Sequence, residues 1–285
     1  MLRRALIALV AAAPAALPAT ALAFDIKPKT PETAFSKKAR PDILGISADS
    51  SAASARTMLE SSFKGRGKAD IQEQKFGSSA LSYTATLNFS LPADPKQTGE
   101  VLSSNFSSPA SANLVYFVDR TLTFALDQQP SKAEMVKQVM DKYGVPTIVG
   151  NQHLYYLYRK GSIMSVGAKY KEATALEAVD RPLDPKMALK LNDSNGRGSC
   201  VAVVKRSLEK EKTLTALLGE AKGANCDGAL SVDLTTGATP DRVGKAQFTL
   251  LDFKRMTSAA KIDADALVAE QTERNPQPKA STPKL

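Results

Sequence analysis

Apolar and small polar side chains alternate between residues 81 and 91, and this alternation is the strongest constraint on the fold. A period of two puts successive side chains on opposite faces of a β-strand, so the pattern predicts a half-buried strand. Its apolar positions are Leu81, Tyr83, Ala85, Leu87, Phe89 and Leu91. A second long strand is predicted over residues 114–124, and the Ser-, Pro- and Asn-rich residues 92–113 are expected to form a loop. The chain must therefore build a sheet and cover at least one of its faces.

Residues 131–146 carry the signals of a complete helix. Ser131 and Glu134 have the spacing of a capping box, in which each side chain bonds the other residue's backbone N–H. Gly144 suits the position after the last helical residue, and Pro146 prevents continuation. The apolar face between these ends comprises Val136, Val139, Met140 and Tyr143.

The remaining segments predict alternating short strands and helices. Before the long strands, a short strand is predicted at 42–46 and is followed by a helix. The helix is capped within 49–51 and ends at Gly65–Gly67. Its apolar face comprises Ala55, Met58, Leu59 and Phe63. After the helix that begins at Ser131, a hairpin is predicted from 154–159 and 162–166, turning at Lys160 and Gly161. The last section predicts strands at 200–205, 229–234 and 246–253, and helices at 211–222 and 262–273.

This element order predicts an α+β fold, with antiparallel sheet and helices packed on one face, divided into two small subdomains. We expect a first α+β domain over residues 41–170 and a second α+β unit over 199–273. Residues 171–198, rich in Asp-Pro and Asn-Gly type turns, are expected to be a linker or long loop. The Pro-containing leader 24–40 is expected to be extended or loose, and the Pro-rich tail 274–285 disordered.

The first 23 residues have the three parts of a bacterial secretory signal peptide. Arg3 and Arg4 form a positive start, residues 5–17 are apolar, and Ala21-Leu22-Ala23 matches the small-x-small cleavage pattern. We expect general (Sec-type) export, cleavage after Ala23, and a periplasmic or secreted mature protein. No later stretch of about 20 apolar residues is present, so no transmembrane segment is expected after cleavage.

The two cysteines and the net charge agree with an exported protein. In an oxidising compartment, Cys200 and Cys226 are expected to form a structural disulfide, because they lack the C-x-x-C spacing of redox-active pairs. Removing the signal lowers the net charge from +9 to +7. This charge favours acidic proteins or an anionic surface as partners, whereas the compartment argues against nucleic acid.

No motif in the chain indicates a catalytic site, a metal site or a cofactor. His153 is the only histidine, and no G-x-S-x-G sequence supports a hydrolase triad built on it. Asp119, Asp127, Glu134 and Asp141 are close in sequence but follow no glycosidase pattern. Residues 65–68 (Gly-Arg-Gly-Lys) have the glycines and cations that suit an anion, but they follow a helix, so a helix stop and turn is the simpler interpretation.

The strongest concentration of aromatic and basic residues lies at 155–160. Tyr156, Tyr158, Arg159 and Lys160 are our candidate binding residues, because Tyr and Arg are favoured at the centres of protein interfaces. Tyr156 and Tyr158 share one strand face while Tyr155 and Leu157 share the other, so one face must be core. Simple strand packing is therefore the alternative interpretation.

Four short segments resemble exported proteobacterial α+β proteins of unassigned function: 42–46 (Asp-Ile-Leu-Gly-Ile), 120–124 (Arg-Thr-Leu-Thr-Phe), 130–134 (Pro-Ser-Lys-Ala-Glu) and 142–146 (Lys-Tyr-Gly-Val-Pro). The small-residue-then-helix opening is also similar, more weakly, to lipoproteins of the outer-membrane assembly machinery and to β-lactamase-inhibitor-like modules. The resemblance covers roughly residues 42–170 and implies protein binding, with no catalytic residue carried over. Unlike those lipoproteins, this chain has no lipidated cysteine after its signal.

The sequence thus predicts a non-enzymatic binding protein of the bacterial envelope. A periplasmic hydrolase acting on a cell-wall or lipid substrate would instead need a clustered pair of desolvated acids in a cleft. A small-ligand binding protein would need an apolar pocket between sheet and helices.

Overall fold

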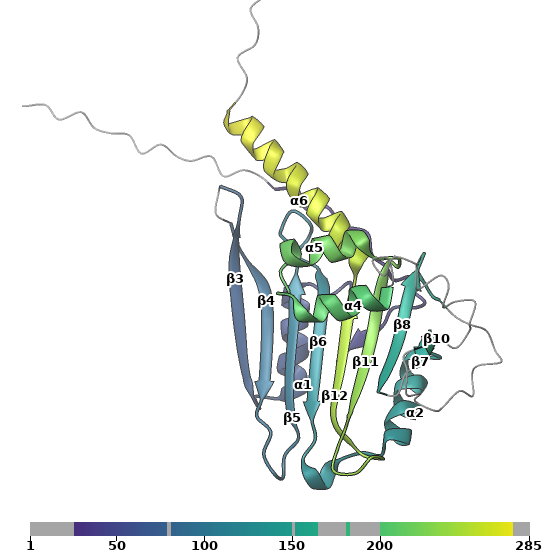
Figure 1. Cartoon of the computed structure of the whole chain (residues 1–285). Coiled ribbons are helices and arrows are strands. Elements are labelled where there is room, and N and C mark those ends of the chain that lie inside the picture. Colours follow the sequence, from purple (N-terminus) through teal and green to yellow (C-terminus); the bar gives the residue numbers. More distant parts are fainter. Residues whose placement is uncertain (1–25, 79–80, 150–151, 165–180, 183–199, 276–285) are drawn as a thin grey trace, which may run out of the picture.

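The fold is built on one large antiparallel sheet (Figure 1). The computed structural model describes residues 26–78, 81–149, 152–164, 181–182 and 200–275. Within these residues the strands follow the order β10-β7-β8-β11-β12-β6-β5-β4-β3, with β9 beside β8. Their bounds are β3 Lys68–Phe76, β4 Leu81–Leu91, β5 Gly99–Phe106, β6 Val115–Thr123, β7 Ile148–Val149, β8 His153–Arg159, β9 Ser162–Ile163, β10 Arg181–Pro182, β11 Gly228–Thr236 and β12 Val243–Leu251. The α+β class is confirmed.

Helices cover both faces of this sheet, whereas the sequence analysis expected them on one. Helices α1 (Ala52–Phe63) and α2 (Lys132–Tyr143) bury their apolar faces in one core. Helices α4 (Cys200–Glu209), α5 (Leu214–Gly223) and the start of α6 (Phe253–Arg274) pack in a second core. Figure 1 shows α4 and α5 in front of the sheet and α1 behind it. Central strands are therefore apolar on both faces.

The two units that the sequence analysis separates share this sheet. Strands β11 and β12 come from the C-terminal section, yet β11 pairs with β8 and β12 pairs with β6. Both neighbours belong to the predicted first domain. The C-terminal section supplies central strands, so its folding is tied to that of residues 41–170. The predicted linker 171–198 lies outside the described residues, except for Arg181 and Pro182 of β10.

Several local predictions are confirmed. The helix α2 begins after Ser131, whose side chain accepts a hydrogen bond from the Glu134 backbone N–H. Ser51 caps α1 in the same way, by accepting from the Ser54 backbone N–H. The β8–β9 turn places Lys160 and Gly161 at φ of 50° and 78°, as a two-residue hairpin turn requires. The single strand predicted at 42–46 is instead a short hairpin, in which a turn with positive φ at Leu44 and Gly45 joins β1 (Asp42–Ile43) to β2 (Ile46–Ser47).

Several elements differ from the predictions, among them the short strands β7 and β10, which were not predicted. Residues 200–205 are helical rather than a strand, because Cys200, Val203, Val204 and Ser207 recur at helical spacing and bury one face of α4. Strand β5 lies inside the predicted loop 92–113. Its serines and asparagine hide the strand signal, although Leu102, Ser104 and Asn105 are buried. Strand β3 was not predicted, because eight of its nine side chains are not buried and show no alternation.

The leader is packed rather than loose. Ala34 and Phe35 are buried, and the Thr33 hydroxyl donates to Asp252 Oδ2 at 2.6 Å. Phe35 contacts Tyr158 edge to face, with 4.8 Å between ring centroids. The predicted signal peptide (residues 1–23) and residues 276–285 lie outside the described residues. No helix in the described part of the chain is long and apolar enough to cross a membrane.

Candidate functional site

The two candidate tyrosines belong to the core, so they do not form the exposed surface considered from the sequence. Tyr156 is 0% exposed and Tyr158 is 2% exposed. Both rings face the α1 and α2 side of the sheet. The Tyr156 hydroxyl donates to the Gly144 carbonyl at 3.0 Å, and burial raises the pKa of both phenols. Strand packing is the correct interpretation of this pair.

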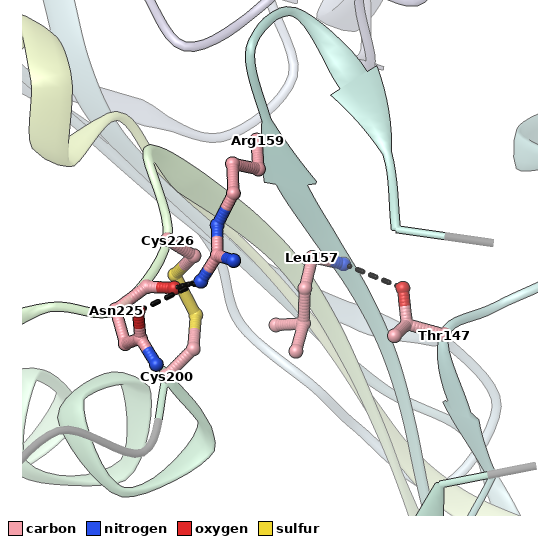
Figure 2. Close-up of a disulfide and its surroundings, with 6 residues drawn as sticks. All are labelled: Thr147, Leu157, Arg159, Cys200, Asn225 and Cys226. Carbon is pink, nitrogen blue, oxygen red and sulfur yellow. Dashed lines mark hydrogen bonds between the residues drawn. A yellow bond between two sulfur atoms is a disulfide. The ribbon is translucent and has the colours of Figure 1, made fainter. Parts of the chain in front are cut away.

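The candidate cations Arg159 and Lys160 stabilise the turn next to the disulfide. Figure 2 shows Arg159 reaching Asn225, where its Nη2 donates to Oδ1 at 2.8 Å and also to the Asn225 carbonyl. The Lys160 backbone N–H donates to Asp227 Oδ2 at 2.6 Å. These contacts join the end of β8 to the segment before β11. They do not place the two residues in a pocket with the tyrosines.

The predicted disulfide between Cys200 and Cys226 is confirmed (Figure 2). It links the first residue of α4 to the segment before β11, with 5.7 Å between the two Cα atoms. Both cysteines are buried in the α4–α5 core. The cross-link therefore fastens the helical layer to the sheet.

The buried acids are dispersed rather than paired. Asp119 accepts hydrogen bonds from Gln247 Nε2 and Thr249 Oγ1, and Asp263 accepts from the hydroxyls of Ser108 and Ser111. Burial raises the pKa of both carboxyls. Of the other acids considered from the sequence, Asp127 is the middle residue of the short 3-10 helix η1 (Leu126–Gln128). Glu134 and Asp141 are on α2, where they bond Gln138 and Lys137 respectively. No hydrogen bond or ion pair joins these carboxylates into one site.

His153 lies on β8 directly opposite Asp233 of β11, and its Nδ1 contacts Asp233 Oδ1. Ser231 Oγ donates to the other carboxylate oxygen at 3.0 Å. The contact between His153 and Asp233 orients the imidazole ring on the sheet.

Within the described residues, no three side chains of His, Cys, Asp or Glu lie close enough to hold a metal ion.

A mainly apolar hollow lies at the β3 edge of the sheet, beneath α1, and we call it the edge pocket. Its volume is about 280 Å³. The end of α1, the turn that follows it, and strands β3 and β4 form its walls. The lining residues are Arg56, Leu59, Glu60, Phe63, Gly65, Arg66, Gly67, Ala69, Ile71, Leu87 and Phe89.

Local sequence signals explain the apolar walls of the edge pocket. Leu59 and Phe63 lie four residues apart on the buried face of α1. Leu87 and Phe89 lie two apart on β4 and point to the same side of the sheet. The rings of Phe63 and Phe89 stack with centroids 3.6 Å apart and planes tilted by 15°. The pocket thus continues the main core outward toward solvent.

Two arginines, Arg56 and Arg66, line the edge pocket. Residues 56–68 carry four basic side chains and one carboxylate. Arg56 Nε pairs with Glu60 Oε1 at 2.7 Å. In the part of the chain that the structure describes, Lys64, Arg66 and Lys68 form no ion pair. We call residues 64–68 the basic turn, and its potential favours an anionic group at the mouth.

The basic turn depends on glycine. Lys64, Gly65 and Gly67 have φ of 44°, 77° and 79°, in the left-handed region that glycine adopts most readily. A Cβ on Gly67 would meet the Phe89 ring and would lie 2.7 Å from the Ser90 carbonyl oxygen. A Cβ on Gly65 would have nothing within 4 Å. Space beside Gly65 is therefore open, whereas Gly67 closes the pocket floor against β4.

Replacing these two glycines separates backbone strain from crowding. Gly65→Ala and Gly67→Ala both put alanine at positive φ, which costs about 1–2 kcal/mol. Gly67→Ala should cost about 1–3 kcal/mol more, because its methyl group overpacks against Phe89. Urea unfolding of both variants measures the difference. Equal losses would show that the Phe89 contact relaxes without cost.

Comparisons with family models, curated proteins and solved structures found no match for this chain. The site is therefore defined by its geometry. Sequence reasoning assigned Leu59 and Phe63 to a helix face and treated residues 65–68 as a turn. It did not join them to β4, because the intervening strand β3 has no apolar alternation. The cations and glycines of residues 65–68 were the sequence signal that could have identified this site.

Proposed function

We propose that this chain is a non-enzymatic binding protein of the bacterial envelope whose ligand places an apolar group in the edge pocket. The observation that carries the proposal is the concave wall of Leu59, Phe63, Leu87 and Phe89, which remains open at its mouth. Exposed concave apolar surface is typical of binding sites. The cations of the basic turn favour a ligand with a negative group beside the apolar one.

The acid geometry weighs against the hydrolase alternative. Asp119 is on strand β6 and Asp263 is on helix α6, and each accepts hydrogen bonds from neutral donors. Hydrolysis of glycosidic bonds uses two carboxyl groups that flank the reacting bond. The edge pocket itself is lined by one carboxylate, Glu60, which is paired with Arg56. Binding therefore fits the described side chains better than acid–base chemistry.

Export is part of this proposal. Its support is the signal-like sequence of residues 1–23 and the buried disulfide, which is typical of oxidising compartments. The mature net charge of +7 also suits an envelope rich in anionic groups. Mass spectrometry of the mature protein from a bacterial periplasm should give Phe24 as the first residue.

Filling the edge pocket is expected to abolish binding of an apolar probe. N-phenyl-1-naphthylamine, whose fluorescence rises in apolar surroundings, would be titrated into the full mature chain. Ala69→Phe adds a ring at an exposed residue that lines the pocket, and should weaken probe binding at least tenfold. The matched control is Val101→Phe on β5, where the native side chain is 52% exposed and lies outside the pocket. Equal affinities of the two variants would contradict the proposal.

A further inference from the structure

Strand β3 is the free edge of the large sheet. It pairs with β4 on one side, and no strand of the described chain pairs with its other side. Figure 1 shows β3 as the outermost strand, away from α4 and α5. On its unpaired side, every second residue of this nine-residue strand presents its backbone N–H and C=O. Such an edge can accept an extended segment as an additional strand.

The edge pocket lies on one face of this strand. Ala69 and Ile71 of β3 line the pocket and are two residues apart, so they share that face. In a strand added beside β3, every second side chain would point to the same face. One of these side chains could therefore enter the pocket between α1 and the sheet. The pocket's volume of about 280 Å³ falls just below the range of about 300–1,000 Å³ typical for drug-sized ligands, and suits a single side chain.

The charges at the mouth decide the direction of the added strand. The basic turn ends at Lys68, which is the first residue of β3. A strand antiparallel to β3 would end beside this turn, whereas a parallel strand would begin there. A chain ends in a carboxylate and begins with an ammonium group, and only the carboxylate complements Arg66, which lines the pocket, and the neighbouring Lys64. The open space beside Gly65 leaves room for it.

We propose that the β3 edge binds the C-terminal segment of a partner protein. The segment is extended and antiparallel to β3, its last side chain is apolar and enters the edge pocket, and its free carboxylate lies at the basic turn. Main-chain pairing supplies affinity, while the pocket and the turn select an apolar residue at a chain end. This inference rests on the proposed function, because it uses the same pocket and names the class of partner.

The test uses fluorescein-labelled hexapeptides with the first five positions randomised and a final leucine or phenylalanine. The peptides captured by the full mature chain would be sequenced, and the best binder remade with a free carboxylate and as its amide. Anisotropy should show that the amide binds at least tenfold more weakly. Arg66→Ala should weaken the free acid about fivefold or more and leave the amide within twofold. Equal binding of acid and amide would overturn the proposal.

Main-chain pairing is tested on the peptide, which avoids altering the fold of the protein. Two versions of the best binder would carry N-methyl groups on alternate amides. One version should lose binding at least tenfold and the other should stay within threefold, because only every second amide of an edge strand faces its neighbour. Loss in neither version, or equal loss in both, would exclude strand addition.

The results of these experiments distinguish a failure of the peptide proposal from a failure of the proposed function. If the naphthylamine probe binds and Ala69→Phe abolishes its binding, but no peptide is captured, the pocket is functional and the peptide proposal fails. Displacement of the probe by decanoate, with no peptide captured, would identify an anionic amphiphile as the ligand instead. If the probe does not bind the unmodified protein, the proposed function fails, and the peptide proposal that rests on it fails too. Capture of peptides unaffected by Ala69→Phe would remove the pocket from the interaction.

Discussion

Replacing Asp252 with alanine is expected to lower the free energy of unfolding by about 3–5 kcal/mol, because it removes the buried one of the two acidic partners of a buried arginine. Asp252 and Arg255 are each 1% exposed, and Arg255 Nε lies 3.9 Å from Asp252 Oδ2. Asp252 Oδ1 also caps α6 by accepting from the Arg255 backbone N–H at 2.9 Å. The same oxygen accepts from the Ala34 N–H at 3.0 Å. One carboxylate thus holds the leader, the start of α6 and a buried cation.

Urea unfolding of the mature chain measures this loss of stability. Two further variants serve as controls for its cause. Asp265→Ala removes another acid of α6, but that acid forms an exposed pair with Lys261, so little change is expected. Asp252→Ala combined with Arg255→Met removes both buried charges and should recover part of the loss. A loss below about 1 kcal/mol in Asp252→Ala would show that Asp49, 3.7 Å from Arg255 Nη2, is a sufficient partner for the arginine.

Removing the disulfide is expected to cost about 3.5 kcal/mol. The cross-link joins residues 26 positions apart, and closing a loop of this length removes that much entropy from the unfolded chain in the chain-entropy model. The change is Cys200→Ala with Cys226→Ala. Unfolding in urea should show a lower midpoint with a similar slope.

Reduction of the unmodified protein provides the control for this double variant. With dithiothreitol, its urea midpoint should fall toward that of the double variant, while the variant itself should not respond to reductant. Both cysteines are buried in the α4–α5 core, so the loss should appear first in the helical layer. A reductant-insensitive midpoint in the unmodified protein would contradict the stabilising role.

The predictions that the structure confirms depend on interactions between residues close together in the sequence. Helix α2 begins at Ser131 because a side-chain oxygen accepts the Glu134 N–H three residues later. The β8–β9 hairpin turns at Lys160 and Gly161 because two residues of positive φ match the twist of paired strands. Strand β4 alternates because its two faces meet different surroundings. Each signal acts within a few residues and can be read without tertiary contacts.

Where the sequence was misread, distant parts of the chain decide. Residues 200–205 form an apolar run whose period is ambiguous over so short a length, and contact with α5 and the sheet makes them helical. Strand β5 contains Ser104 and Asn105, which are buried because helices cover both faces of the sheet. Tyr156 and Tyr158 were candidates for an interface because tyrosine occurs both in cores and at binding surfaces.

The sequence by itself determined the α+β class, the cysteine pair, most helix and strand positions and the excess of positive charge. Tertiary structure decided that β11 and β12 enter the centre of the sheet, that helices cover both faces, and that β3 remains at the edge. It also brought α1, the basic turn and β4 around one apolar pocket. The physical reason is range: caps, turns and periodicity act between near neighbours, whereas strand order and pockets arise from contacts between segments far apart in the chain.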